Sequence, residues 1–486
     1  MATTSLKQRT IVGMIWVGIQ KFGTLFISFL SNIVLARLLT PDDYGMIGML
    51  AIFISVSSAF VDGGFGSALI QKTAPRTQDY TTVFYWNIFL SIAFYLALFG
   101  AAPIIENFYN NITGLSEVLR LQGLILIINS LTTVQFNILR KKMEFRLLAV
   151  INVASSFISL CSAIVLAWLG FGIWALVWQQ IILSSSNVVL AWVFCQWRPT
   201  GRFSFESLKE LFSFGSFIML SSLINTIGNN INGLIIGKFF NPSILGYYTQ
   251  AKRVEDVSSL SLLAVVEQVS YPMLVEVKND YKKMASVLAN FNSALLAITM
   301  PFLLFLFIVA TPVVVLLFSD KWLPSAPILQ ILAIHGIFIV LQGANYNAIA
   351  AIGQSQVLFR WTIIKRCFGI LITIGLMLPF GFNGFLWGVV TSGFFIALCN
   401  MYLVEKFIHY PFINQISKLL PVIAISTIPF ISIWYIELLL NNDSLIIQTL
   451  LGVLYLLIYF SILWFVPIDS IRFLKHYIIG FIKRKK

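Results

Sequence analysis

Residues 36–45 read ARLLTPDDYG and residues 237–246 read GKFFNPSILG, so one short pattern occurs twice at an offset of 201 positions. A cation, a proline and a glycine recur at matching positions: Arg37, Pro41 and Gly45 in the first copy, Lys238, Pro242 and Gly246 in the second. Self-similarity at a long, fixed period indicates a repeated structural unit. The pattern therefore predicts a chain built from two related halves.

The composition around these copies is that of a membrane protein. Hydrophobic residues make up 58% of the chain and charged residues only 10%, whereas a soluble domain has about 25% charged residues. Apolar runs long enough to cross a bilayer recur from end to end and predict an all-α, polytopic membrane protein of about fourteen transmembrane helices. Each copy of the pattern joins the first and second helices of a six-helix unit.

Six helices return the chain to the side of the membrane where it started, so the two repeats are expected to be parallel. The predicted organisation is an N-terminal lobe over 1–200, a C-terminal lobe over 201–410, and an appended two-helix hairpin with a basic tail over 411–486. No separate soluble domain is expected.

Basic residues predict the orientation. The N-terminus and every second connection hold most of them, including Arg360, Lys365 and Arg366, while the opposite connections hold only Arg37, Lys238 and Lys321. By the positive-inside rule, both termini are expected in the cytoplasm. The formal charge of +13 then reflects topology, and no nucleic-acid partner is expected.

Polar side chains form matching stripes on the first helix of each repeat. At 100° per residue the first stripe contains Lys21, Thr24, Ser28 and Asn32, and the second contains Ser221, Ser222, Asn225, Asn229 and Asn232. Thr24 aligns with Asn225 and Ser28 with Asn229 at the repeat offset. The coincidence favours two lobes that face a shared polar cleft, the alternative being that these residues hold helices together.

Ionisable residues inside predicted membrane helices are costly and usually mark a transport path. Lys21 is expected near mid-membrane. It would act there either as a cation of the cavity or as one member of a structural ion pair. Arg120 is expected at the start of the fourth helix, where it would be either a cation of the cavity or an anchor at the membrane interface. Asp62, in DGGFG, is a candidate for ion coupling or for a structural helix end.

A second charged group lies in residues 251–270, AKRVEDVSSLSLLAVVEQVS, which are expected in the eighth helix. Lys252 and Arg253 are candidate cavity cations, although Lys252 and Asp256 are four positions apart and suited to pair with each other. Asp256 and Glu267 are the further candidates for ion coupling; Glu267 has no partner within one turn.

Enzyme motifs are absent from the sequence, which contains no Walker A, GxSxG or HExxH pattern. The connections on the outer side are too short to house a glycan polymerase or ligase site, so an enzyme is the weaker alternative. No catalytic residue, metal or cofactor is expected. Transport by this chain would therefore be powered by an ion gradient.

Three stretches carry a family resemblance: the N-terminal SLKQRTIVGMIWVGIQKFGTLFISFLSNIVLARLLTPDDYGMIGM, then FVDGGFGSALIQ, then LIIGKFFNPSILGYYTQAKRV. They resemble the polysaccharide exporters, Wzx-type lipid-linked oligosaccharide flippases of the multidrug/oligosaccharidyl-lipid/polysaccharide superfamily. The resemblance covers at least residues 5–410. It implies two six-helix lobes around a polar, partly cationic cavity that opens alternately to either face of the bacterial inner membrane.

The implied substrate is an undecaprenyl-diphosphate-linked oligosaccharide for O-antigen, capsule or exopolysaccharide, with proton or sodium as coupling ion, the bilayer around it and polysaccharide assembly proteins as partners. Carried over, Lys21, Lys252 and Arg253 would attract the diphosphate and the asparagine stripe would hold sugar. Here Glu255 and Asp256 accompany that cationic pair, a departure that reduces the positive charge at that level. The main alternative is a drug or small-metabolite antiporter of the same superfamily.

Overall fold

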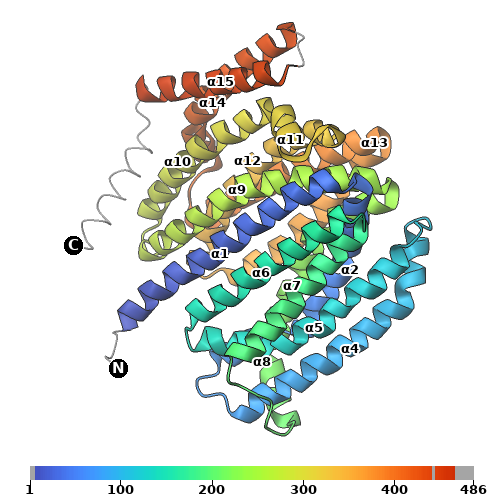
Figure 1. Ribbon diagram of the computed structural model, residues 1–486. Helices are drawn as coiled ribbons and strands as arrows, with labels where there is room; N and C mark the ends of the chain where they lie inside the picture. The colour runs from blue at the N-terminus through green and yellow to red at the C-terminus, as the bar shows by residue number, and fades with distance from the viewer. Residues whose placement is uncertain (1–5, 441–443, 466–486) are drawn as a thin grey trace. The chain divides into compact units, whose positions relative to one another are not determined.

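The computed structural model describes residues 6–440 and 444–465, apart from the side chains of 6–11, 260–269 and 355. Within these residues the chain forms α-helices and one 3-10 turn, and no strand occurs (Figure 1). The prediction of an all-α membrane protein is confirmed. The packing of the helices divides the chain into two compact units, Met1–Thr249 and Gln250–Lys486.

The first unit is a bundle in which neighbouring helices pack in pairs: α4 on α5, α1 on α6, α6 on α7 and α2 on α8. Its elements are α1 (Leu6–Leu38), α2 (Pro41–Asp62), α3 (Phe65–Gln71), α4 (Thr77–Phe108), α5 (Leu115–Lys141), α6 (Phe145–Trp168), α7 (Ile173–Phe194), α8 (Phe205–Phe239) and the start of α9 (Pro242–Glu276).

The second unit centres on α10, which packs against α12, α14 and α15. After the rest of α9, its elements are α10 (Tyr281–Ile308), α11 (Ala310–Phe318), the 3-10 turn η1 (Asp320–Trp322), α12 (Ser325–Ala351), α13 (Ser355–Ile408), α14 (Phe412–Leu440) and α15 (Leu445–Phe465). The long α13 is interrupted at Gly381, whose backbone (φ 59°, ψ −139°) is not helical.

Twelve helices of the described chain are long and apolar enough to cross a membrane. α13 counts once among them despite its interruption, and α9, with its charged residues, is not one of them. A total of fourteen stays a prediction. So does the repeat boundary near residue 200, because the division between compact units falls inside α9.

The repeated sequence pattern is a helix start. Thr40 caps α2: its hydroxyl accepts from the backbone N–H of Asp43, and the Asp43 carboxylate accepts from the N–H of Thr40. In the second copy the Asn241 amide oxygen accepts from the N–H of Ile244 at 2.9 Å. Pro41 and Pro242 are the first residues of α2 and α9, where the fixed φ of proline suits a helix and no N–H is lost. Local chemistry thus determines where both helices begin.

Arg360, Lys365 and Arg366, counted above among the loop charges, lie inside α13. Lys365 is inside α13, 4% exposed, and its ammonium donates to the Asn400 side-chain oxygen. The Asn400 amide in turn donates to the Gln342 carbonyl at 3.2 Å. The assignment of Lys365 to a connection was therefore wrong, because it is buried within a helix and its hydrogen-bond partner, Asn400, lies far along the same helix.

Candidate functional site

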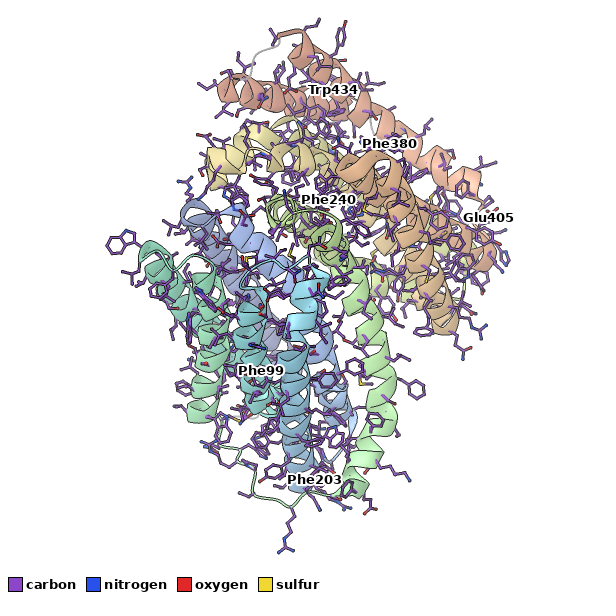
Figure 2. All side chains as sticks on the ribbon, turned by 90° about the vertical axis from the view of Figure 1, so that its right-hand side faces the viewer. Phe99, Phe203, Phe240, Phe380, Glu405 and Trp434 are labelled. Carbon is purple, nitrogen blue, oxygen red and sulfur yellow. The ribbon has the colours of Figure 1, made fainter. Side chains whose placement is uncertain are left out.

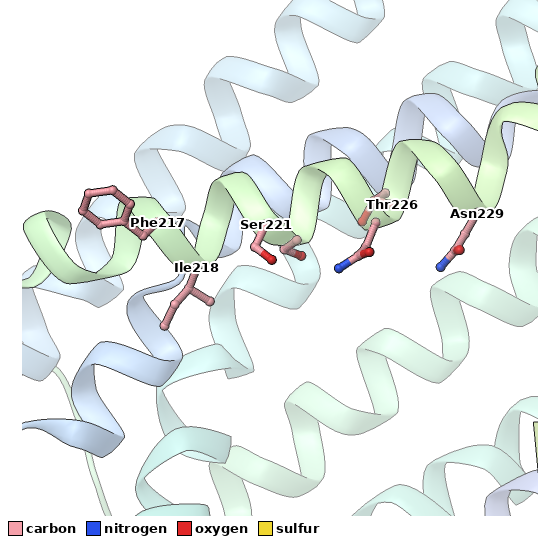
Figure 3. Close-up of a pocket in the computed structure, with 7 residues that line it drawn as sticks. Phe217, Ile218, Ser221, Thr226 and Asn229 are labelled. Carbon is pink, nitrogen blue, oxygen red and sulfur yellow. The ribbon is translucent and has the colours of Figure 1, made fainter. Parts of the chain in front are cut away.

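A polar hollow of about 500 Å³ lies along one face of α8 (Figure 3). Its lining falls in two columns of every fourth residue: Phe217, Ser221, Asn225 and Asn229 in one, Ile218, Ser222 and Thr226 in the other. Residues four apart lie one above the other on a helix, so this face presents hydroxyl and amide groups in a continuous row. None of the lining side chains is charged.

Packing on the other side of α8 leaves this face uncovered. α8 lies against α2, α3 and α4, and glycines allow the close approach. A Cβ built on Gly64 would lie 2.2 Å from the Gly215 carbonyl oxygen, and one on Gly233 would lie 3.3 Å from that of Gly48. The side chains of Ser221, Ser222, Asn225 and Asn229 are exposed. Tight backbone contact on one side thus leaves the polar face free to line the hollow.

Two of the three asparagines predicted to bind substrate on α8 line the hollow, and the third does not. Asn225 and Asn229 line the hollow. Asn232 does not, and its amide donates to the Tyr248 hydroxyl at 3.2 Å. Phe217 and Ile218 were missed because a search for polar stripes passes over apolar residues. Their i−4 spacing from Ser221 and Ser222 was the available signal, and Phe217, 78% exposed, adds an aromatic ring to the hollow.

Only part of the polar stripe on α1 is exposed. Lys21 and Ser28 are exposed. The Thr24 hydroxyl donates to the Gln20 carbonyl at 2.7 Å within its own helix. Asn32 is 4% exposed and faces protein. The N-terminal part of the stripe is therefore available to a ligand, whereas its last member is packed.

The charged group of α9 is internally paired in the second unit. The Lys252 ammonium donates to the Glu255 carboxylate and, at 2.7 Å, to that of Asp256. Glu255 is fully buried, and it also accepts from the Ser259 hydroxyl at 2.7 Å. Arg253 is exposed. Lys252 thus has two acidic partners, which matches the structural alternative; a role in binding substrate stays a prediction for both cations.

The remaining candidates are scattered. Arg120 lies on α5 with its guanidinium carbon 4.5 Å from the ring centroid of Phe99 on α4 (Figure 2), and its Nε donates to the Phe99 carbonyl at 3.4 Å. This contact fits an anchor. Asp62 is exposed at the C-terminal end of α2. Glu267 belongs to α9, but its side chain is outside those that the structure describes.

The site is therefore brought together only in part. The residues of α1 and α8 belong to the first unit and the α9 charges to the second, so a cavity shared by both stays a prediction. In the part of the chain that the structure describes, no group of three His, Cys, Asp or Glu side chains is placed to hold a metal ion. The uncharged hollow on α8 lies wholly within the first unit.

Comparison with known sequences gives a family match. The sequence model of a family described as "Polysaccharide biosynthesis protein" matches residues 34–327. The teichuronic acid biosynthesis protein TuaB of Bacillus subtilis is 26% identical over 376 residues, 77% of either chain. The lipopolysaccharide biosynthesis protein WzxC of Escherichia coli is 22% identical over 363 residues, 74% of either chain.

Two solved structures share the fold. The lipid II flippase MurJ in an inward closed conformation superposes with a TM-score of 0.74 at 17% identity, over 93% of this chain and 99% of that one. An inward-facing multidrug resistance MATE family transporter of the MOP superfamily gives 0.64 at 15% identity, over 82% of this chain and 98% of that one. At these identities the likeness concerns architecture.

Proposed function

Since this chain belongs to the polysaccharide biosynthesis protein family, we propose that it is a flippase which moves a lipid-linked oligosaccharide across the bacterial inner membrane for surface polysaccharide synthesis. The substrate class is an undecaprenyl-diphosphate-linked oligosaccharide, carried from the cytoplasmic to the outer leaflet. Relatives named for the biosynthesis of teichuronic acid and lipopolysaccharide and for the transport of succinoglycan support this class.

The observation that carries the proposal is the hollow on α8. Buried hydroxyls and amides are costly inside a membrane protein unless they meet a polar partner. Ser221, Asn225 and Asn229 line the hollow with hydroxyl and amide groups and without any charge, which suits the neutral hydroxyls of sugar rings. A drug cation would instead call for an anionic or extended aromatic lining.

The charged part of the substrate needs a different partner. A diphosphate is held by charge-assisted hydrogen bonds from lysine or arginine. Lys21 is an exposed cation on the first polar helix, and we assign it this role, with Arg253 as a second contact. The polyprenyl tail can remain in the bilayer. Proton or sodium exchange would drive the cycle, with Asp62, Asp256 and Glu267 as candidate sites, and both termini would lie in the cytoplasm.

Complementation tests the proposal. A strain that lacks this gene and any redundant exporter should accumulate lipid-linked oligosaccharide in the cytoplasmic leaflet, and the intact chain should restore its appearance in the outer leaflet. Asn225→Ala with Asn229→Ala removes two amides from the hollow and should slow export roughly tenfold, because each lost hydrogen bond costs about 0.5–1.5 kcal/mol.

Asn152→Ala is the matched control. The Asn152 amide on α6 donates to the Leu148 carbonyl of its own helix at 2.8 Å, outside the hollow, so export should continue near the normal rate. Outer-leaflet precursor in the strain without the chain would refute the flippase assignment. Equal export by the double variant and the control would refute the sugar-binding role of the hollow.

A further inference from the structure

The two halves of α13 fold back on each other and pack closely through glycines. The chain turns at Gly381, whose backbone is not helical. A Cβ built on Gly388 would lie 2.7 Å from the Cα of Thr373, and one built on Gly369 would lie 3.4 Å from the Cβ of Ser392. Positions before the turn thus face positions at a similar distance after it. The two halves therefore run antiparallel.

This hairpin places Lys365 of the first half opposite Asn400 of the second. The lysine ammonium donates to the Asn400 side-chain oxygen, and the two residues are 4% and 3% exposed. The Asn400 amide donates to the Gln342 carbonyl of α12 at 3.2 Å, and the Gln342 amide donates to the Gly393 carbonyl at 3.0 Å. Because α12 holds its nitrogen, Asn400 directs its oxygen to the lysine. The acceptor is therefore both fixed in place and neutral.

Lys365 has no carboxylate partner in the part of the chain that the structure describes. None of the ion pairs among those residues includes it. Its ionisable neighbours are Cys399 and Arg366, both on α13. The helices α10, α12 and α14 pack against α13, and their described residues add no ionisable group that acts on this lysine. A buried charge is normally paired with an opposite charge, so this environment is unusual for an ammonium.

The neutral partner allows Lys365 to exist in two protonation states. Burial penalises the charged form of a lysine, which makes the neutral amine accessible. When the ammonium gives one proton to water, the amine keeps two N–H groups, and one of them can still donate to Asn400. Lys252 differs, because loss of its proton would break its ion pairs with Glu255 and Asp256. Lys365 can therefore bind and release a proton while its surroundings stay hydrogen-bonded.

The depth of Lys365 along its helix suits a proton carrier. It lies about ten residues after Ser355, the first residue of α13. At 1.5 Å per residue this is about 15 Å, roughly half the thickness of the hydrocarbon core of a bilayer. Ionisable side chains at such depth are costly, and in pumps and transporters they form proton relays.

We propose that Lys365 is the residue through which proton movement drives export. It takes up a proton from one side of the membrane and releases it to the other as the second unit changes conformation. This proposal rests on the proposed export function and selects the proton as the coupling ion, with one proton entering for each lipid-linked oligosaccharide that leaves. The site is separate from the carboxylates of Asp62, Asp256 and Glu267.

Reconstituted vesicles test this coupling. The purified intact chain is placed in liposomes with labelled undecaprenyl-diphosphate-linked oligosaccharide, isolated from the strain that lacks the chain, and potassium with valinomycin holds the membrane potential at zero. A gradient of one pH unit should then enrich the labelled lipid about tenfold in the leaflet on the acidic side, because equal concentration ratios carry equal free energies in a one-for-one exchange.

Variants separate coupling from a purely structural role. Lys365→Met removes the proton site, and Lys365→Arg keeps a positive charge at every accessible pH, so both should abolish the enrichment. Asn400→Asp places a carboxylate beside the ammonium and should also abolish it, because an opposite charge favours the protonated form. This variant should stay folded in thermal denaturation, since the buried cation gains a partner. Lys406→Met, at an exposed lysine of the same helix, is the matched control and should keep the enrichment.

The outcomes distinguish this proposal from the export function itself. Enrichment retained by Lys365→Met or by Asn400→Asp would overturn the role of Lys365 and leave the flippase assignment intact. An intact chain that moves the lipid without any response to the pH gradient would do the same. Loss of enrichment in a folded Asn400→Asp variant, with enrichment kept by Lys406→Met, supports the proposal. Failure of the intact chain to move the lipid between leaflets at all would instead refute the proposed function.

Discussion

Gly64 allows a quantitative test of how α2 and α3 are held against α8. It lies in the left-handed region at φ +70°, between the two helices. A Cβ at this position would lie 2.2 Å from the Gly215 carbonyl oxygen of α8. Gly64→Ala therefore imposes two penalties at once, a strained backbone and a steric overlap with another backbone.

The two penalties have known sizes. A left-handed residue with a Cβ costs about 1–2 kcal/mol, and overpacking costs about 1–3 kcal/mol. Gly64→Ala should therefore lower the free energy of unfolding by roughly 2–5 kcal/mol. Gly114 has a φ of +84° but open space around its Cβ position, so Gly114→Ala should cost only the first penalty, about 1–2 kcal/mol.

The assay is denaturation of the purified chain in detergent, followed by tryptophan fluorescence, with the two variants compared under identical conditions. Gly100→Ala is a third variant. It lies within α4 in open space and should stabilise slightly, because alanine is the better helix former by about 1 kcal/mol. If Gly64→Ala and Gly114→Ala were equally destabilised, the close packing of α8 on this turn would be refuted.

Two further predictions concern ion pairs. Burial alone would lower the pKa of Lys72, but its bonds to Glu210 at 2.8 Å and Asp79 at 3.0 Å outweigh burial and hold the pKa above its ordinary value. Lys72→Met should cost about 1 kcal/mol. This cost should be constant below the unfolded-state pKa of about 10.4 and should disappear as the pH rises through the higher folded-state pKa. Chemical denaturation at pH 7 and at about pH 12, beyond the range in which the lysine loses its proton, checks this, and an equal cost at both would contradict it. Lys252→Gln leaves the fully buried Glu255 without its cation and should cost about 3–5 kcal/mol, most of it recovered by adding Glu255→Gln. Export by that recovered double variant would rule out Lys252 as a substrate contact, and its loss despite recovered stability would support one.

The sequence was sufficient wherever a feature depends on a single helix. Apolar runs predicted the all-α membrane fold, and residues four apart predicted that Asn225 and Asn229 share a face, because helix period alone decides which side chains lie together. Thr40 with Pro41, and Asn241 with Pro242, likewise marked where two helices begin, because capping is local.

Tertiary structure decided everything that depends on a partner from another segment. Lys365 looked like a loop charge until Asn400 and burial placed it inside the second unit. Gly45 and Gly246 were only matching letters of a repeat, and their Cβ distances show that each must admit the backbone of the other copy. Hydropathy and helical period report on each helix by itself. They carry no information about which distant carbonyl or amide will lie beside it, and that information exists only once the helices are packed.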